Sequence, residues 1–304
     1  MSNYHIPKWA KAIVPKGCGS METEIIDVDV PEPGPGEILV RITHSGVCHT
    51  DLSLASNSLG HVKTGNRQIG GHEGVGVVVK LGSGVSKRQL GDRVGIKWIA
   101  SCCMSCDMCL SGFESKCAKR KVSGFGGYPG TFQQYVVTDA SYATTISEHV
   151  DSAKAAPLLC GGVTVFVALQ RADLSPGQWV AVSGAGGGLG SLAVQYAKAM
   201  GLSVLAIDHP SKDQFCRNIG ADAFIDYMKF DEDGLVVEAK RLTGGGAHAV
   251  LVCNSSIKSY ANSLDLLRLG GVLVCVGLPE SSDGPITGAI PSKVIMNRLT
   301  IKGD

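Results

Sequence analysis

The stretch QWVAVSGAGGGLGSLAVQYAKAMG, residues 178–201, decides the fold class of the second half of this chain. An apolar run at 178–183 leads into a glycine-rich segment at 184–190, and small residues at helical spacing follow it. A strand, a glycine turn and a helix in this order are typical of a dinucleotide-binding unit, because backbone amides at the helix N-terminus can approach a pyrophosphate. The candidate cofactor-binding glycines are Gly184, Gly187, Gly188 and Gly190.

The sequence after this stretch continues the alternation of strand and helix. Further apolar strands are predicted at 203–207, 223–225, 249–253 and 272–276, and each of the later strands follows a helical stretch. This alternation predicts an α/β domain with a doubly wound parallel sheet over residues 161–304.

Asp208 ends the second of these strands, about twenty residues after the glycine loop. An acid at this place binds the hydroxyls of the adenosine ribose in dinucleotide-binding domains. A carboxylate would also repel a 2′-phosphate, so we expect NAD as the cofactor in preference to NADP.

The first half of the chain has a different pattern. Residues 24–30 and 36–42 alternate apolar and polar side chains, and prolines and glycines separate these two runs. The valine-rich run at 74–80 is a further strand signal. Period-two alternation with such turns predicts a β-rich domain, which we place at residues 1–160.

Composition excludes several classes of function. The 304 residues are 44% hydrophobic and 18% charged, and the net charge is +1. This charge gives no reason to expect binding to nucleic acid or to an anionic membrane. No uninterrupted apolar run is long enough to span a membrane, and the N-terminus lacks the features of a secretory or transit signal. We therefore expect a cytoplasmic protein without a membrane or nucleic-acid partner.

Four cysteines at short spacing predict a structural metal site. They occur in CMSCDMCLSGFESKC, residues 103–117, and are Cys103, Cys106, Cys109 and Cys117. Four thiolates in one small lobe are typical of a closed tetrahedral zinc site, which stabilises a loop. A redox Cys-x-x-Cys pair would not explain all four. An iron–sulfur cluster also uses four cysteines, but the rest of the chain does not favour it.

Cys48, His72 and Cys160 could form a second, open metal site. A catalytic zinc ion commonly has three protein ligands and keeps a fourth position for water or substrate. Taken singly, each of these residues is more often part of a core than a ligand. The surrounding motifs favour the metal site.

These motifs are GVCHTD at 46–51, GGHEGVG at 70–76 and CGGVT at 160–164. They resemble the zinc-dependent medium-chain alcohol dehydrogenases, particularly the yeast type. The glycine loop lacks strict G-x-G-x-x-G spacing and resembles the yeast-type variant, in which one extra residue precedes Gly-Gly-Leu-Gly. The resemblance implies a GroES-like catalytic domain followed by a Rossmann domain, with one catalytic and one structural zinc ion per chain.

The resemblance also implies roles for residues near these motifs. Thr50 would take the alcohol proton, Asp51 would orient His72, and Glu73 would lie close behind the metal. His49 would contact the cofactor pyrophosphate, Lys212 the adenosine ribose and Val276 the nicotinamide carboxamide. Thr50 and Asp51 could instead be turn or cap residues.

The chain departs from the family pattern in three places. Ser53 stands where yeast-type enzymes have a histidine that ends the proton relay, and a hydroxyl is not a base near neutral pH. A second pocket tryptophan is replaced near Leu59, whereas Trp98 matches a pocket aromatic, or is plain core. Family members also continue beyond the last residues of this chain, so we expect the C-terminal part of the catalytic domain to be absent and the last strand to be incomplete.

We interpret the sequence as a zinc alcohol dehydrogenase that interconverts primary alcohols and aldehydes with NAD. Two alternatives are a zinc dehydrogenase for a polyol or larger alcohol, and a truncated zinc- and NAD-binding fragment without turnover. Zinc-free quinone reductases share the fold but would not need either set of zinc ligands. The resemblance implies a homo-oligomer, a dimer or tetramer, in a chain with a complete C-terminus.

Overall fold

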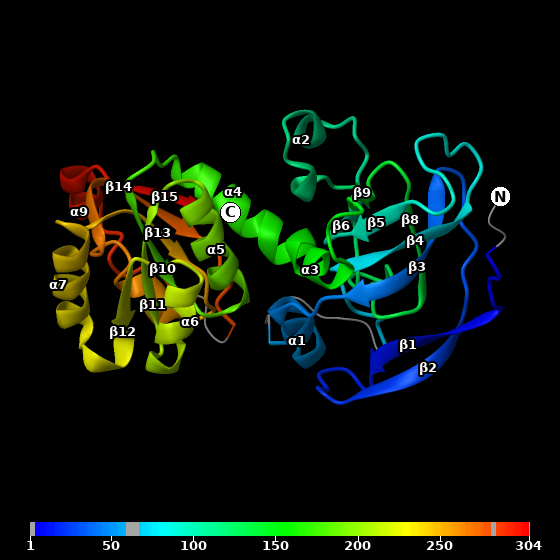
Figure 1. The fold of residues 1–304 in the computed structure, drawn as a ribbon, viewed down its shortest axis with the longest axis horizontal. Helices are drawn as coiled ribbons and strands as arrows, with labels where there is room; N and C mark the ends of the chain where they lie inside the picture. The colour runs from blue at the N-terminus through cyan, green and yellow to red at the C-terminus, as the bar shows by residue number, and fades with distance from the viewer. Residues whose placement is uncertain (1–3, 59–66, 281–283, 304) are drawn as a thin grey trace. The chain divides into compact units, whose positions relative to one another are not determined.

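The computed structural model describes residues 4–58, 67–280 and 284–303 (Figure 1). The chain forms two compact units, residues 1–160 and 161–304, each with its own sheet and core. The first unit is mainly antiparallel and the second is parallel. The predicted α/β class, with a β-rich part followed by a Rossmann sheet, is confirmed.

A five-stranded antiparallel sheet forms the centre of the first unit, in the order β8-β3-β4-β5-β9. Alternate residues of these strands, such as Ile38, Val40 and Val78, are fully buried in its core. The strands are β3 (Glu37–Ser45), β4 (Gly74–Leu81), β5 (Arg93–Ile96), β8 (Tyr135–Asp139) and β9 (Thr144–Thr145).

Two smaller antiparallel pairs and three short helices complete the described part of this unit. The first pair is an antiparallel hairpin. The second pair lies beside the cysteine-rich segment. These strands are β1 (Trp9–Pro15), β2 (Thr23–Asp29), β6 (Ile99–Ser101) and β7 (Lys121–Val122), and the helices are α1 (His49–Ser56), α2 (Asp107–Leu110) and α3 (Ser152–Pro157), with a 3-10 turn at Glu114–Lys116.

One long helical segment, Ser152–Ala172, contains α3, a π-helical turn at Leu158–Gly162 and α4 (Val163–Ala172). Its first turn is capped by Asp151, whose Oδ1 accepts hydrogen bonds from two backbone amides. Its length and its mean hydropathy of 1.6 would suit a membrane span, although 44% of its apolar stretch is buried within the protein. Buried core helices of soluble proteins can have the same length and composition, so this is weak support for a membrane.

The second unit has a six-stranded parallel sheet in the order β12-β11-β10-β13-β14-β15. Numbered within the sheet, this is the 3-2-1-4-5-6 order of the Rossmann fold, in which the chain changes direction between the first and fourth strands. Ligands bind such sheets at the carboxyl ends of the strands beside that point. The strands are β10 (Trp179–Ser183), β11 (Ser203–Asp208), β12 (Ala223–Asp226), β13 (Ala247–Val252), β14 (Leu267–Cys275) and β15 (Thr300–Gly303).

Helices cover both faces of this sheet, and each face has its own core. Residues of α4, α5 and α6 pack on one face, and residues of α7, α8 and α9 pack on the other. Small residues of α5, including Ala193 and Ala197, are fully buried and allow the helix to approach the sheet closely. The helices are α5 (Gly188–Ala199), α6 (Asp213–Asn218), α7 (Glu232–Thr243), α8 (Ile257–Ala261) and α9 (Pro291–Asn297), with 3-10 turns at Pro210–Lys212 and Tyr227–Lys229.

The sequence predicted β14 too short. It begins at Leu267, five residues before the predicted strand, and its register with β13 shifts between Ala247 and Ala249. Two glycines, Gly270 and Gly271, interrupt the apolar pattern of this strand. This interruption conceals its first half in the sequence.

Candidate functional site

Four side chains from three separate segments converge in the first unit. Cys48 immediately precedes α1, His72 and Glu73 immediately precede β4, and Cys160 lies in the π-helical turn. One ligand atom from each of these residues lies within 4.8 Å of each of the others. π-Helical turns are frequent at functional sites. The fold thus brings together the three predicted catalytic zinc ligands and the predicted neighbouring carboxylate.

The segment before β4 is held by backbone hydrogen bonds that place His72. The amides of Thr131 and Phe132 donate to the carbonyls of Gly71 and Gly70 at 3.0 and 2.9 Å. Gly71 has φ +92°, and a Cβ there would lie 2.6 Å from Thr131 Oγ1. This position favours glycine, because a side chain would be strained at this φ and would collide with Thr131 and Phe132.

Asp51 links the segments that carry the ligands. Its Oδ2 accepts a hydrogen bond from the Cys48 amide at 2.9 Å, and its Oδ1 accepts one from the Gly71 amide at 3.1 Å. The same Oδ1 lies 3.2 Å from His72 Nδ1, although the angles there are poor for a hydrogen bond. A carboxylate beside one ring nitrogen directs the other, Nε2, toward a metal.

The buried His72 ring fits a metal ligand. Its side chain is 1% exposed, and neither ring nitrogen makes a well-aligned hydrogen bond within the described part of the chain. Buried polar atoms are rarely left without a partner. A metal ion bound at Nε2 would satisfy one of these atoms.

The distance between the two cysteines also fits zinc. Cys48 Sγ lies 3.9 Å from Cys160 Sγ. Two thiolates bound at about 2.3 Å to one tetrahedral zinc ion lie about 3.8 Å apart.

Charges at this site favour a thiolate beside an imidazolium before any metal binds. The hydrogen bond from Cys160 lowers the pKa of Cys48 to about 4, and the same contact raises the pKa of Cys160. Burial opposes the charged form of His72, but Asp51 and Cys48 outweigh it and raise the pKa of His72 to about 9. Metal binding must therefore displace the His72 proton as well as the Cys160 proton.

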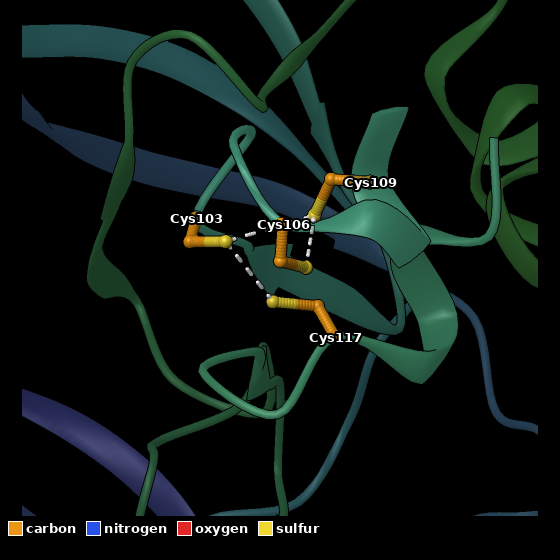
Figure 2. A group of neighbouring side chains, drawn as sticks. All are labelled: Cys103, Cys106, Cys109 and Cys117. Atoms are coloured by element: carbon orange, nitrogen blue, oxygen red, sulfur yellow. Dashed lines mark hydrogen bonds between the residues drawn. The ribbon is translucent and has the colours of Figure 1, made fainter. Parts of the chain in front are cut away.

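The four predicted structural ligands form a second sulfur cluster, shown in Figure 2. Cys103 Sγ lies 3.9 Å from Cys109 Sγ and 3.6 Å from Cys117 Sγ, and Cys106 Sγ lies 3.6 Å from Cys109 Sγ. These distances fit the edges of a tetrahedron around zinc, about 3.8 Å long. Backbone and side-chain hydrogen bonds from Ser105 lower the pKa of Cys103 to about 5, which favours the thiolate that binds metal.

Cys102, next to this cluster in the sequence, is outside it. Its Sγ lies 3.3 Å from Met104 Sδ, and the group of four converging sulfurs contains Cys103 instead. Of the two adjacent cysteines, Cys102 and Cys103, Cys103 belongs to the cluster and Cys102 does not.

The glycine loop follows β10, at the point where the strand order of the parallel sheet reverses. Gly184 has φ +78°, and α5 begins at Gly188. The Gly186 amide donates a hydrogen bond of 2.7 Å to Asp208 Oδ2, and a Cβ on Gly186 would lie 2.8 Å from the Lys212 side chain. The predicted ribose-binding residues, Asp208 and Lys212, thus lie against the loop predicted to bind the pyrophosphate.

Gly190 and Gly188 provide a matched test of this loop. A Cβ on Gly190 would lie 2.1 Å from the Gly184 carbonyl oxygen, whereas a Cβ on Gly188 would meet no atom within 4 Å. Gly190→Ala is expected to lower the free energy of unfolding by about 1–3 kcal/mol. Gly188→Ala is expected to change it by less than about 0.5 kcal/mol and to weaken cofactor binding about tenfold, because its methyl group occupies the pyrophosphate approach.

Urea unfolding and calorimetric titration with NAD measure these two effects. Equal stability of the two variants would contradict the packing argument. Unchanged NAD affinity of Gly188→Ala would contradict the assignment of the loop.

The remaining predicted residues have these positions. His49 is exposed at the start of α1, and Thr50 is partly buried one residue later. Ser53 is buried, and its hydroxyl donates to the His49 carbonyl at 3.0 Å. Val276 follows β14 and packs on the core of one face of the parallel sheet. Leu59 lies outside the described residues.

Trp98 contacts His72, the predicted metal ligand, and the sequence did not predict this contact. The two rings meet edge to face with centroids 5.0 Å apart, and Phe125 stacks on Trp98 at 6.4 Å. Phe125 was missed because a phenylalanine among glycines gives no ligand or pocket pattern. The SGF motif before two further glycines was the one signal of a tight loop there.

Both halves of the chain match known families. Residues 34–148 match the Alcohol dehydrogenase GroES-like domain, and residues 188–304 match the Zinc-binding dehydrogenase family. Alcohol dehydrogenase 2 of Emericella nidulans is 47% identical over an alignment that covers 100% of this chain and 85% of the relative. The chain is a zinc-dependent medium-chain alcohol dehydrogenase. The identification places it among zinc-dependent oxidoreductases and makes both groups of metal-binding side chains candidate zinc sites.

Solved structures similar to this alcohol dehydrogenase contain either cofactor. Acetophenone reductase of Geotrichum candidum in complex with NAD is 28% identical, with a TM-score of 0.83, over 99% of this chain and 83% of the other. The CAD protein of Helicobacter pylori complexed with NADP(H) is 26% identical, with a TM-score of 0.82, over 98% and 84%. Cofactor choice in this alcohol dehydrogenase must therefore be argued from its own residues.

Proposed function

We propose that this protein oxidises primary alcohols with NAD and reduces the corresponding aldehydes in the reverse direction. The observation that carries the proposal is the convergence of Cys48, His72 and Cys160, with Asp51 behind the histidine. These residues would hold the zinc ion, which supplies Lewis-acid chemistry toward an alcohol oxygen, while NAD supplies the hydride acceptor.

The protein's own groups position and deprotonate the substrate. Thr50 lies two residues after Cys48. Its hydroxyl would relay the alcohol proton, accepting it while passing its own proton on toward water. Ser53 cannot continue this transfer as a base, and its hydroxyl already donates to the His49 carbonyl. Water must therefore complete proton release in place of a terminal histidine.

Asp208 supports NAD over NADP. Its carboxylate lies at the end of β11 against the glycine loop, where it would accept hydrogen bonds from ribose hydroxyls and repel a 2′-phosphate. Asp208→Asn keeps an acceptor oxygen but removes the charge. This change is expected to lower the ratio of kcat/KM with NAD to kcat/KM with NADP by about 10–100-fold, since each charged hydrogen bond contributes about 1.5–3 kcal/mol.

Initial-rate kinetics with both cofactors measure this ratio. Asp222→Asn is a matched control, because Asp222 lies at the other end of the same strand pair and binds Lys198. A wild-type preference for NADP, or the same ratio in Asp208→Asn, would contradict the assignment.

NADH formation from ethanol tests the proposed reaction. Purified, zinc-loaded protein is expected to turn over, and a chelator that removes zinc is expected to abolish the turnover. Activity that survives complete zinc removal would overturn the proposal. Stoichiometric zinc and NAD binding without turnover on ethanol, benzyl alcohol or a polyol would instead identify a non-catalytic binding protein.

We also propose that the protein forms a homo-oligomer through the edge of its parallel sheet. β15 is the edge strand of this sheet, and nearby α9 exposes Ile295 and Met296 by 71% and 76%. An exposed strand edge beside apolar side chains favours pairing with a second copy. Sedimentation analysis of the wild type and of Met296→Glu tests this: a monomeric wild type would refute it.

A further inference from the structure

We propose that Phe125 is a positioning residue, which holds the Trp98 ring against the metal ligand His72 and thereby selects the size of the alcohol. The effect on alcohol size rests on the proposed function. The effect on the Trp98 ring stands on geometry alone.

Three aromatic rings form a continuous contact that ends at the metal site. His72 and Trp98 meet at an interplanar angle of 81°, and Trp98 and Phe125 stack at 23°. Each aromatic pair of this kind is attractive beyond its buried area. The Trp98 ring therefore contacts both His72, the predicted metal ligand, and Phe125, which has no assigned role.

The backbone of Trp98 is already fixed by the loop that carries Phe125. The Ser123 amide donates to the Trp98 carbonyl at 2.9 Å, and the Ser123 hydroxyl donates to the Lys97 carbonyl at 2.8 Å. Ser123 is 1% exposed, so water does not compete strongly with these bonds. The remaining freedom of Trp98 is rotation of its side chain, which the stacked Phe125 ring restricts.

The loop also touches the segment that leads to His72. A Cβ on Gly124 would lie 3.0 Å from the Gly71 backbone nitrogen, so the two backbones are in close contact. Gly124, Gly126 and Gly127 have positive φ angles of 75°, 63° and 82° around Phe125. A chain with so many glycines has little local stiffness, and the Phe125 side chain supplies an anchor.

Trp98 is half-buried, and its free surface is the predicted wall of the substrate pocket. Loss of the Phe125 ring would leave space into which the indole could turn. The substrate pocket would then be wider. Short alcohols would lose contact with Trp98, and bulky alcohols would fit more easily.

The test compares Phe125→Leu and Phe125→Tyr with the control Phe113→Leu, which changes an exposed phenylalanine in the cysteine-rich lobe. Each protein is labelled with 5-fluorotryptophan, and the resonance of Trp98 is assigned with Trp98→Phe. Phe125→Leu is expected to shift or broaden this resonance alone among those of Trp9, Trp98 and Trp179. Phe125→Tyr and Phe113→Leu are expected to leave it near its wild-type position.

Kinetics provide the second readout. Phe125→Leu is expected to raise KM for ethanol and to move the kcat/KM ratio of benzyl alcohol to ethanol about fivefold toward benzyl alcohol. Phe125→Tyr is expected to restore the wild-type ratio. Zinc content and Tm of all variants show whether the site and the fold remain intact.

The two proposals fail in different ways. An unmoved Trp98 resonance in Phe125→Leu would overturn the positioning role. An equal loss of activity on both alcohols would overturn the selection of alcohol size. If the wild type oxidises neither alcohol, the proposed function and the size selection fail, and the resonance alone decides whether Phe125 positions Trp98.

Discussion

Cys48→Ala is expected to lower kcat/KM for ethanol by about 10³-fold or more, because loss of one of three protein ligands removes several kcal/mol of transition-state stabilisation. The fold should change little, since the Cys48 backbone amide still donates to Asp51. Steady-state kinetics and thermal melting of the same preparation measure both quantities.

Cys18→Ala is the matched control for this change. Cys18 is exposed and lies in neither sulfur cluster. This variant should retain wild-type kinetics. If Cys48→Ala retained its turnover per folded molecule, Cys48 would have no role in the reaction.

Cys103→Ala is expected to act on stability first. A closed four-thiolate site contributes its metal-binding free energy to folding. Loss of this metal should lower Tm by about 10 °C, as expected for several kcal/mol in a unit of 160 residues. Metal analysis should show loss of zinc from this site, while activity per folded molecule remains close to that of the wild type.

The neighbouring Cys102→Ala provides a stringent control. It removes an adjacent thiol that lies outside the four-sulfur cluster. Its zinc content and Tm should match the wild type. If Cys102→Ala and Cys103→Ala lowered Tm equally, the assignment of Cys103 as a metal ligand and of Cys102 as a non-ligand would be wrong.

The elements predicted from the sequence were those with strong local patterns. The strand, glycine turn and helix at 178–201 appear as β10, the loop and α5, because alternation and glycine spacing are local properties. The four-cysteine spacing likewise places all four ligands within 15 consecutive residues, 103–117. Ligands so close in the sequence can meet whatever the rest of the fold is, so their spacing alone predicts the site.

Features that depend on tertiary contacts were not predicted. The resemblance placed Ser53 in the proton relay, but sequence gave no indication that its hydroxyl turns back to the His49 carbonyl within its own helix. The stack of Phe125 on Trp98 joins the residue before β6 to the turn after β7, and no periodic pattern encodes it. Such contacts depend on how loops of irregular conformation close.

The hydrogen bond from the Gly186 amide to Asp208 links cofactor choice to the shape of the glycine loop. A change at Asp208 that admits a phosphate also removes the acceptor that orders the turn, unless the new residue supplies another oxygen. Preference for one dinucleotide and rigidity of the loop therefore cannot evolve independently in this protein. A substitution at Asp208 that switches the cofactor must therefore keep an acceptor for the Gly186 amide, or the turn must be held in another way.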